Sequence, residues 1–166
     1  MRRRTLLLLC AAAVIGWVGG PAWAGVSLQV SPVQGGASLE VDFGTARSLG
    51  ADGEEESDTV IRQVKLKISS DSSRSYRVLQ RMNGPWAGPD GKEIPVGTVQ
   101  LSVSESGTGG TNRFPTPSTI SLGEQEIFLS SPSGAAEDLL LTYTVKIPVG
   151  QRAGSYRTTV SYQVVG

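Results

Sequence analysis

The sequence predicts an all-β fold: an antiparallel two-sheet β-sandwich, immunoglobulin-like, with about eight strands. Two observations support this prediction. From residue 26 onward, apolar and polar residues alternate with a period of two in almost every segment. No segment there places apolar residues at helical spacing between helix caps. Glycine, proline and short polar residues separate the alternating segments, as expected of turns.

The first 24 residues have the features of a secretory signal peptide. Arg2–Arg4 form a positive n-region, and an apolar run follows over Leu6–Val18. Ala22 and Ala24 then supply small residues at positions −3 and −1 of a cleavage site. The apolar run is shorter than the roughly 18 residues that favour a membrane span. We expect cleavage after Ala24 and a single β-sandwich domain over residues 25–166.

The composition of this domain limits the cellular compartments and partner classes that suit it. The chain has 15 basic and 15 acidic residues, and loss of the three arginines at 2–4 leaves 12 basic residues and a net charge near −3. This acidic balance, with no second hydrophobic run, favours an exported protein without nucleic-acid partner or membrane span. The only cysteine, Cys10, lies in the signal peptide, so we expect a cysteine-free domain without disulfides. We expect its final location to be the periplasm, the cell surface or the medium.

Two segments near the end of the chain have the strongest strand pattern. These are Asp138–Pro148 and Ser155–Val165, and their inward-facing residues are expected to include Leu139, Leu141, Tyr143, Val145, Val160 and Tyr162. The earlier candidate strands are Val26–Val30, Ser38–Phe43, Thr59–Ser69, Ser75–Met82, Thr98–Val103 and Gln125–Leu129. Because each strand has one polar face, two sheets must cover each other's apolar faces. A barrel is the main alternative.

The connections between these strands differ in length. Ser69–Arg74 is expected to close a hairpin between its two neighbouring strands. Asn83–Gly97 contains several glycines and prolines and is expected to be a long surface excursion. Ser104–Thr119 has the composition of a flexible loop, and Glu137 is expected to lie in a loop as well.

The residues needed for common catalytic chemistry are missing. Without histidine, and without cysteine after residue 24, the chain has no Ser-His-Asp or Cys-His arrangement and no usual zinc ligands. Paired carboxylates occur at Glu40 with Asp42 and at Glu124 with Glu126, a pairing that glycosidases use. Alternating carboxylates are also the normal solvent-facing residues of a half-exposed sheet. The sequence therefore predicts no enzyme, no cofactor, and no catalytic, cofactor-binding or metal-binding residue.

Three weaker signals each have a structural and a functional interpretation. The acidic run at residues 52–58 suits calcium but lacks the spacing of an EF-hand loop, so we expect a solvated loop. A basic stripe on the outer face of the expected hairpin is interpreted as protection against aggregation rather than a nucleic-acid site; it consists of Lys65, Lys67, Arg77 and Arg81. Trp86 either caps one end of the core or binds sugar or protein from a proline-stiffened loop.

Two stretches resemble a known family. Leu39–Gly44 resembles the strand ending in Phe-Gly that opens many chaperone–usher pilins and spore coat protein U-type domains. Tyr143–Pro148, followed by Gly150-Gln151 and Ala153–Tyr156, is similar to the strand, turn and strand that close those domains. Together they cover about a third of residues 25–166, with alternation typical of strands.

This resemblance implies an incomplete immunoglobulin-like sandwich that lacks one strand. A periplasmic chaperone, and then the N-terminal extension of a neighbouring subunit, fills the gap by strand addition. Residues 25–34 correspond to such an extension, since Val26, Leu28 and Val30 alternate with polar residues. The chain departs from the family at Val33–Ser38, which lacks the cysteine that those subunits often carry.

The resemblance and the composition together lead to one functional hypothesis and one alternative. The hypothesis is an exported structural or assembly protein of a bacterial surface fibre or coat, similar to a pilin subunit. A periplasmic chaperone and usher, or other copies of the chain, would then be its partners through residues 25–34. The alternative is a secreted, non-catalytic carbohydrate- or protein-binding module that uses the loops Asn83–Gly97 or Ser104–Thr119.

Overall fold

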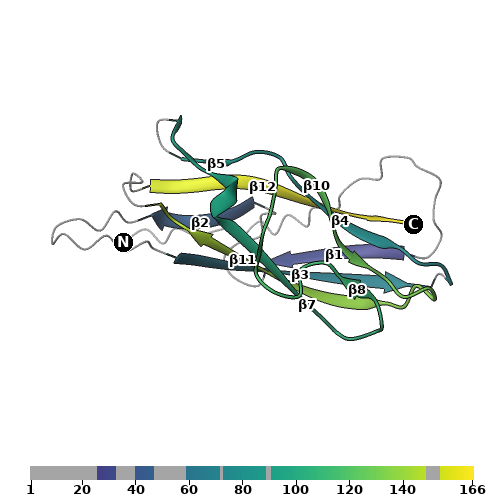
Figure 1. Ribbon diagram of the computed structural model, residues 1–166. Helices are drawn as coiled ribbons and strands as arrows, with labels where there is room; N and C mark the ends of the chain where they lie inside the picture. The colour runs from purple at the N-terminus through teal and green to yellow at the C-terminus, as the bar shows by residue number, and fades with distance from the viewer. Residues whose placement is uncertain (1–25, 33–39, 47–58, 72, 89–90, 149–153) are drawn as a thin grey trace, which may run out of the picture.

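A computed structural model confirms the all-β prediction (Figure 1). It describes residues 26–32, 40–46, 59–71, 73–88, 91–148 and 154–166. Two antiparallel sheets face each other across an apolar core, and this confirms the sandwich. The expected signal peptide, the acidic run at residues 52–58 and the segment Val33–Ser38 lie outside the described residues.

The smaller sheet has five strands in the order β1-β3-β11-β7-β9. Their bounds are Val26–Pro32 for β1, Thr59–Ser70 for β3, Glu137–Lys146 for β11, Val99–Glu105 for β7 and Ser118–Thr119 for β9. β1 pairs with β3 over its whole length, from Val26 opposite Ser70 to Pro32 opposite Val64.

The larger sheet is built around β12. Six of its strands follow the order β6-β5-β12-β4-β10-β8, and β2 also pairs with β12. Their bounds are Glu93–Ile94 for β6, Trp86–Ala87 for β5, Gly154–Val165 for β12, Arg77–Met82 for β4, Gly123–Leu129 for β10, Thr111–Asn112 for β8 and Glu40–Ala46 for β2. A short 3-10 turn at Val96–Thr98 precedes β7.

The connectivity is that of an immunoglobulin-like sandwich. β3 pairs with β11 in one sheet, and β4 pairs with β12 in the other. Consecutive strands β3 and β4 thus lie in different sheets, and so do β11 and β12. This Greek-key interlock joins strands that are far apart in the sequence, as in the B–E and C–F pairs of immunoglobulin domains.

All eight strands predicted from alternation are present. Their observed bounds differ from the predicted ones by up to three residues, as Ser38–Phe43 shows, which is observed as Glu40–Ala46. The inward-facing residues are also confirmed. Of those predicted, Tyr162 is partly buried against the core, and the others are buried: Leu139, Leu141, Tyr143, Val145 and Val160.

The predicted hairpin at Ser69–Arg74 is wrong. β3 and β4 do not pair, because the chain crosses there from the smaller sheet to the larger one. The predicted basic stripe is therefore split between two outer faces. Lys65 and Lys67 are exposed on the smaller sheet, whereas Arg77 and Arg81 are exposed on the larger sheet. Alternation indicates which way a side chain points but not which strand lies beside it.

Asn83–Gly97 is more than a surface excursion. Trp86 in β5 and Ile94 in β6 are buried and belong to the core. The cap interpretation of Trp86 is therefore confirmed, because its side chain is 0% exposed and lies among core residues. Close packing also requires a glycine at Gly88, since a Cβ there would lie 2.1 Å from the ring of Tyr156.

Candidate functional site

One side of the sandwich is closed by residues 111–120, which we call the covering segment. At its start, β8 pairs with β10 of the larger sheet, and Arg113 N donates a 3.1 Å hydrogen bond to Ile127 O. At its end, β9 pairs with β7 of the smaller sheet, and Ile120 N donates to Val99 O at 3.2 Å. The segment thus satisfies edge groups of both sheets, which would otherwise be open to other chains.

Further contacts hold the covering segment in the middle. Val103 N donates to Phe114 O at 2.7 Å, and Val103 O accepts from Asn112 Nδ2 at 2.6 Å. Arg113 binds the Glu126 carboxylate through two nitrogens, at 2.8 and 2.7 Å. The expectation of a flexible loop over Ser104–Thr119 is therefore wrong for this part: it is an ordered edge cover.

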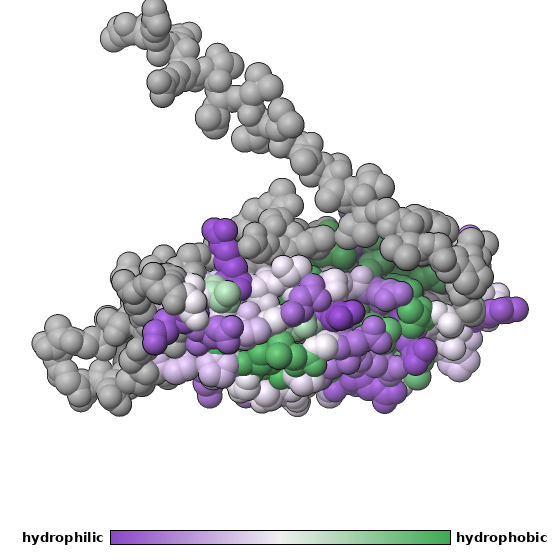
Figure 2. Space-filling model, turned by 90° about the horizontal axis from the view of Figure 1, so that it is seen from above, coloured by the Kyte–Doolittle hydropathy of each residue, from purple (hydrophilic) through white to green (hydrophobic). Residues whose placement is uncertain are grey.

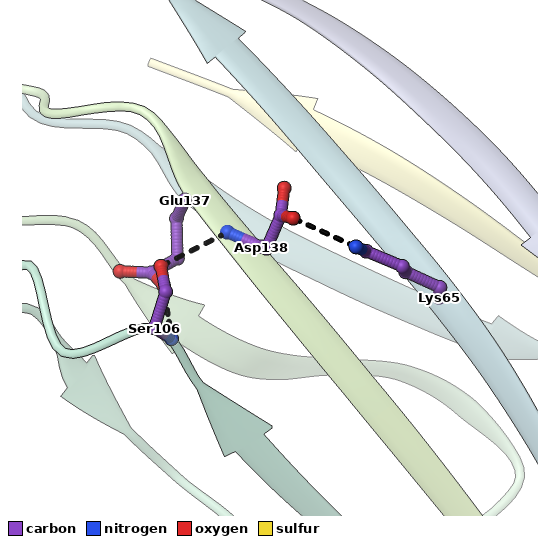
Figure 3. Close-up of polar contacts among 4 residues, drawn as sticks. All are labelled: Lys65, Ser106, Glu137 and Asp138. Carbon is purple, nitrogen blue, oxygen red and sulfur yellow. Dashed lines mark hydrogen bonds and ion pairs between the residues drawn. The ribbon is translucent and has the colours of Figure 1, made fainter.

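The turn before the covering segment is anchored by Glu137, which Figure 3 shows beside Ser106. Its carboxylate accepts hydrogen bonds from Ser106 N at 2.5 Å and Thr108 N at 3.3 Å, and from both hydroxyl groups of these residues. Burial alone raises the pKa of this carboxyl, but the hydrogen bonds from Ser106 and Thr108 outweigh burial and lower it. The prediction that Glu137 lies in a loop is wrong, because it begins β11 and is 2% exposed.

The opposite side of the larger sheet is only half covered. β2 pairs with β12 from Gly154 to Thr159, on the side away from β4 and β5, since Arg157 pairs with both Asp42 and Ala87. Beyond Thr159, β12 continues to Val165 with β4 alone as its partner among the described strands. Figure 1 shows β2 beside the first half of β12, and the second half running on towards the C terminus. We call residues 161–165 the open edge.

The backbone direction along the open edge follows from one hydrogen bond. Asn83 N donates to Thr159 O at 3.1 Å, so the polar groups of Thr159 point towards the β4 side. Polar backbone groups alternate along a strand, so those of residues 161, 163 and 165 also face β4. The N–H and C=O groups of Tyr162 and Val164 consequently point sideways, away from β4, along the other side of β12. They are two donors and two acceptors that no described strand pairs with.

A buried polar network lies beneath the open edge. Tyr143 Oη donates to Gln80 Oε1 at 2.7 Å and lies 2.9 Å from the hydroxyl of Tyr162. Burial raises the pKa of Tyr143 and of Tyr162 well above the usual tyrosine value. Through these contacts the two hydroxyl groups join β11 of the smaller sheet to β4 and β12 of the larger sheet.

On the face seen in Figure 2, hydrophobic residues form separate areas with hydrophilic residues between them. The large apolar residues that are exposed in the described ranges are Ile61, 51% exposed in β3, and Leu122, 52% exposed before β10. Ile61 lies on the smaller sheet and Leu122 in the turn that leads into the larger sheet, so these two side chains do not form one patch.

The remaining sequence signals do not meet in one place. Glu126 is bound to Arg113, and Glu124 is exposed one residue from the turn at Gly123. The side chains of Glu40 and Asp42 lie outside the described ones. Over the described ranges, no three Asp, Glu, His or Cys side chains come close enough to hold a metal ion. In the same ranges, no helix is long and apolar enough to cross a membrane.

The open edge was not found by sequence reasoning, although the sequence carries a signal for it. Residues 160–165 alternate but contain neither a charged residue nor a proline, the usual devices that protect an exposed edge. Comparison with known proteins adds nothing to this site, because no protein-family model, curated protein or solved structure matches the chain.

Proposed function

We propose that this chain is a non-enzymatic structural subunit of an exported bacterial fibre or coat, and that it assembles by adding strands at a sheet edge. The observation that supports the proposal is the contrast between the two sides of the sandwich. The covering segment satisfies edge groups of both sheets on one side. On the other side, the open edge has backbone groups that no described strand pairs with, and these are the groups that strand addition uses.

The alternative, a secreted carbohydrate- or protein-binding module, has less support. Its two candidate loops serve the fold instead. Trp86, in the first loop, is 0% exposed and packs in the core. The second loop contains the turn held by Glu137 and the covering segment held by both sheets. Neither offers an exposed aromatic side chain of the kind that dominates binding sites.

The structure changes the role that we assign to residues 25–34. Val26, Leu28 and Val30 pack against the chain's own core, and β1 pairs with β3. A self-contained domain has this arrangement, so the proposal assigns the acceptor role to the open edge. For residues 25–34 to insert into a neighbouring copy, or to exchange with a chaperone strand, they must leave β3 and the core.

Light scattering of residues 25–166 tests this proposal. We expect oligomers whose proportion rises with concentration, and we expect deletion of residues 25–34 to lower the melting temperature, because it removes the pairing with β3. Association is expected to persist in the deletion variant if it still folds. A parent protein that remains monomeric up to its solubility limit contradicts the assembly function. An unchanged melting temperature contradicts the place of β1 in the fold.

A further inference from the structure

We infer that the open edge of β12 pairs antiparallel with the open edge of a second copy, about a two-fold axis at Gln163. The inference rests on the proposed assembly function and names the partner at its acceptor edge. A strand that lies beside its own copy can satisfy the same groups on both chains at once, which is the isologous contact of two-fold dimers.

The register follows from the length of the open edge. β2 occupies β12 up to Thr159, and β12 ends at Val165. The midpoint of residues 161–165 is Gln163, so full overlap places Gln163 opposite its own copy. Tyr162 then lies opposite Val164 of the second copy, with their N–H and C=O groups facing each other. The two equivalent pairs use all the outward-facing groups of both residues.

The side chains suit this register on both faces. Tyr162 and Val164 point inward and are only partly buried in the single chain, so each covers the other across the new contact. Ser161 and Gln163 are exposed on the outer face, and neither repels its opposite residue. The open edge has no charge and no proline, so no protective device opposes an identical strand.

A second copy fits this edge better than the chain's own first strand. β1 already lies in the smaller sheet, where Val26, Leu28 and Val30 pack against the core. β1 also lies near β12, since Cα atoms of the two strands approach within 8 Å. Among the described strands, what β12 leaves unpaired is a backbone edge, and edge-to-edge pairing is the contact that uses it.

Cysteine cross-linking tests the register. Residues 25–166 contain no cysteine, so a Gln163→Cys variant has one thiol for each chain. Directly opposite residues in a pair without mutual hydrogen bonds have Cα atoms about 4.5 Å apart, within the range of a disulfide. We expect oxidation to convert this variant to a covalent dimer. Thr159→Cys is the matched control, because Thr159 is exposed on the same strand and face but lies beside β2. We expect it to form little dimer.

A charge pair at the same position tests the inference without oxidation. Gln163→Lys and Gln163→Glu each place two like charges opposite each other, so each should weaken self-association several-fold. Mixing the two variants should restore association at least to the wild-type level, because the opposite residues then attract each other. Because Gln163 is exposed, we expect both variants to fold, and circular dichroism and melting temperature check this.

The outcomes separate the inference from the proposed function. If the wild type associates but Gln163→Cys cross-links no better than Thr159→Cys, the partner at the edge is not a second β12. If association then disappears on deletion of residues 25–34, that segment is the occupant instead. If the wild type does not associate at any soluble concentration, both the inference and the assembly function fail.

Discussion

Tyr143, in the central strand of the smaller sheet, donates a 2.7 Å hydrogen bond to Gln80 in the facing sheet. A tyrosine has one hydroxyl hydrogen, so the 2.9 Å contact between Tyr143 and Tyr162 must use the hydrogen of Tyr162. The three side chains thus form a directed chain through the core. Gln80 Nε2 has no partner in the described part of the chain, so the bond from Tyr143 is what offsets burial of this amide.

Tyr143→Phe should lower the free energy of unfolding by about 1–3 kcal/mol, because it leaves the buried Gln80 carbonyl without a donor. Tyr162→Phe removes only a donor to a hydroxyl that already bonds to Gln80, so its effect should be smaller. Urea denaturation of both variants measures the difference. Equal losses would contradict the direction assigned to the chain of hydrogen bonds.

Stability should also fall in alkali. Burial raises the pKa of Tyr143 and Tyr162 in the folded protein, whereas both groups titrate near pH 10 when unfolded. Above that pH the unfolded chain releases protons that the folded protein retains, so unfolding becomes more favourable as pH rises. Denaturation midpoints from pH 8 to about 11 should decrease, and the decrease should be shallower for Tyr143→Phe.

Glu137→Ala should destabilise the fold by about 1–3 kcal/mol, because it removes the acceptor of four hydrogen bonds at Ser106 and Thr108. Asp138→Ala is the matched control. Asp138 is the next residue and forms an ion pair with Lys65 (Figure 3), and both side chains are partly exposed to solvent. Its loss should cost less than about 1 kcal/mol. Similar midpoints for the two variants in urea would contradict the anchoring role of Glu137.

The same carboxylate makes the protein sensitive to acid. The pKa of Glu137 is lower in the folded state than in the unfolded chain, so its stabilising effect is complete above the unfolded value, about 4.3. The effect is lost as pH falls through the folded pKa. Between neutral pH and pH 3, the wild type should therefore lose more stability than Glu137→Gln. Parallel curves for the two proteins would rule out this contribution.

Leu141→Asp should prevent stable folding. Leu141 is 0% exposed at the centre of β11, and an unpaired carboxylate there costs several kcal/mol out of a total stability of about 5–15. Ser104→Asp, on an exposed position of the neighbouring strand, should stay within about 0.5 kcal/mol of the wild type. Soluble yield and circular dichroism distinguish the two. A folded Leu141→Asp variant would mean that β11 faces the other way.

Gly110→Ala should loosen the start of the covering segment. A Cβ at residue 110 would lie 2.2 Å from the Phe128 ring and 2.7 Å from the backbone oxygen of Leu129. We expect a loss of about 1–3 kcal/mol, because a backbone atom cannot move aside as a side chain can. At Gly84 a Cβ meets nothing within 4 Å, so Gly84→Ala is the control. Melting temperatures that fall equally would show that the Phe128 contact is not limiting.

Alternation in the sequence was enough to predict the strands and their buried faces. Leu139 and Leu141 illustrate this, because burial at every second residue is a local property of one strand. Alternation does not identify which strands pair with each other. Lys65 and Arg81 both point outward, yet they belong to different sheets, so the predicted hairpin was wrong. Strands of two residues, such as β8 and β9, are too short to show a period.

The misplacement of Glu137 has a related cause. A carboxylate that follows a turn-rich stretch is normally exposed, and nothing next to it in the sequence signals burial. Its partners, Ser106 and Thr108, lie 31 and 29 residues earlier and meet it only once β7 and β11 are paired. Predicting the open edge also requires the strand pairing, because an edge is recognised only from which strands lie on either side of it.

The position of β12 in the larger sheet determines when the molecule can fold. β12 follows the other strands in the chain, yet β2, β4 and β5 all pair with it. Until residues 154–165 have been synthesised, these three strands lack the partner that joins them, and β3 waits for β11 in the same way. Such distant pairings are slow to form, because the loop must close before any contact is gained. We therefore expect truncations that remove residues 154–165 to be recovered as unfolded protein, because β2, β4 and β5 lose the strand that joins them.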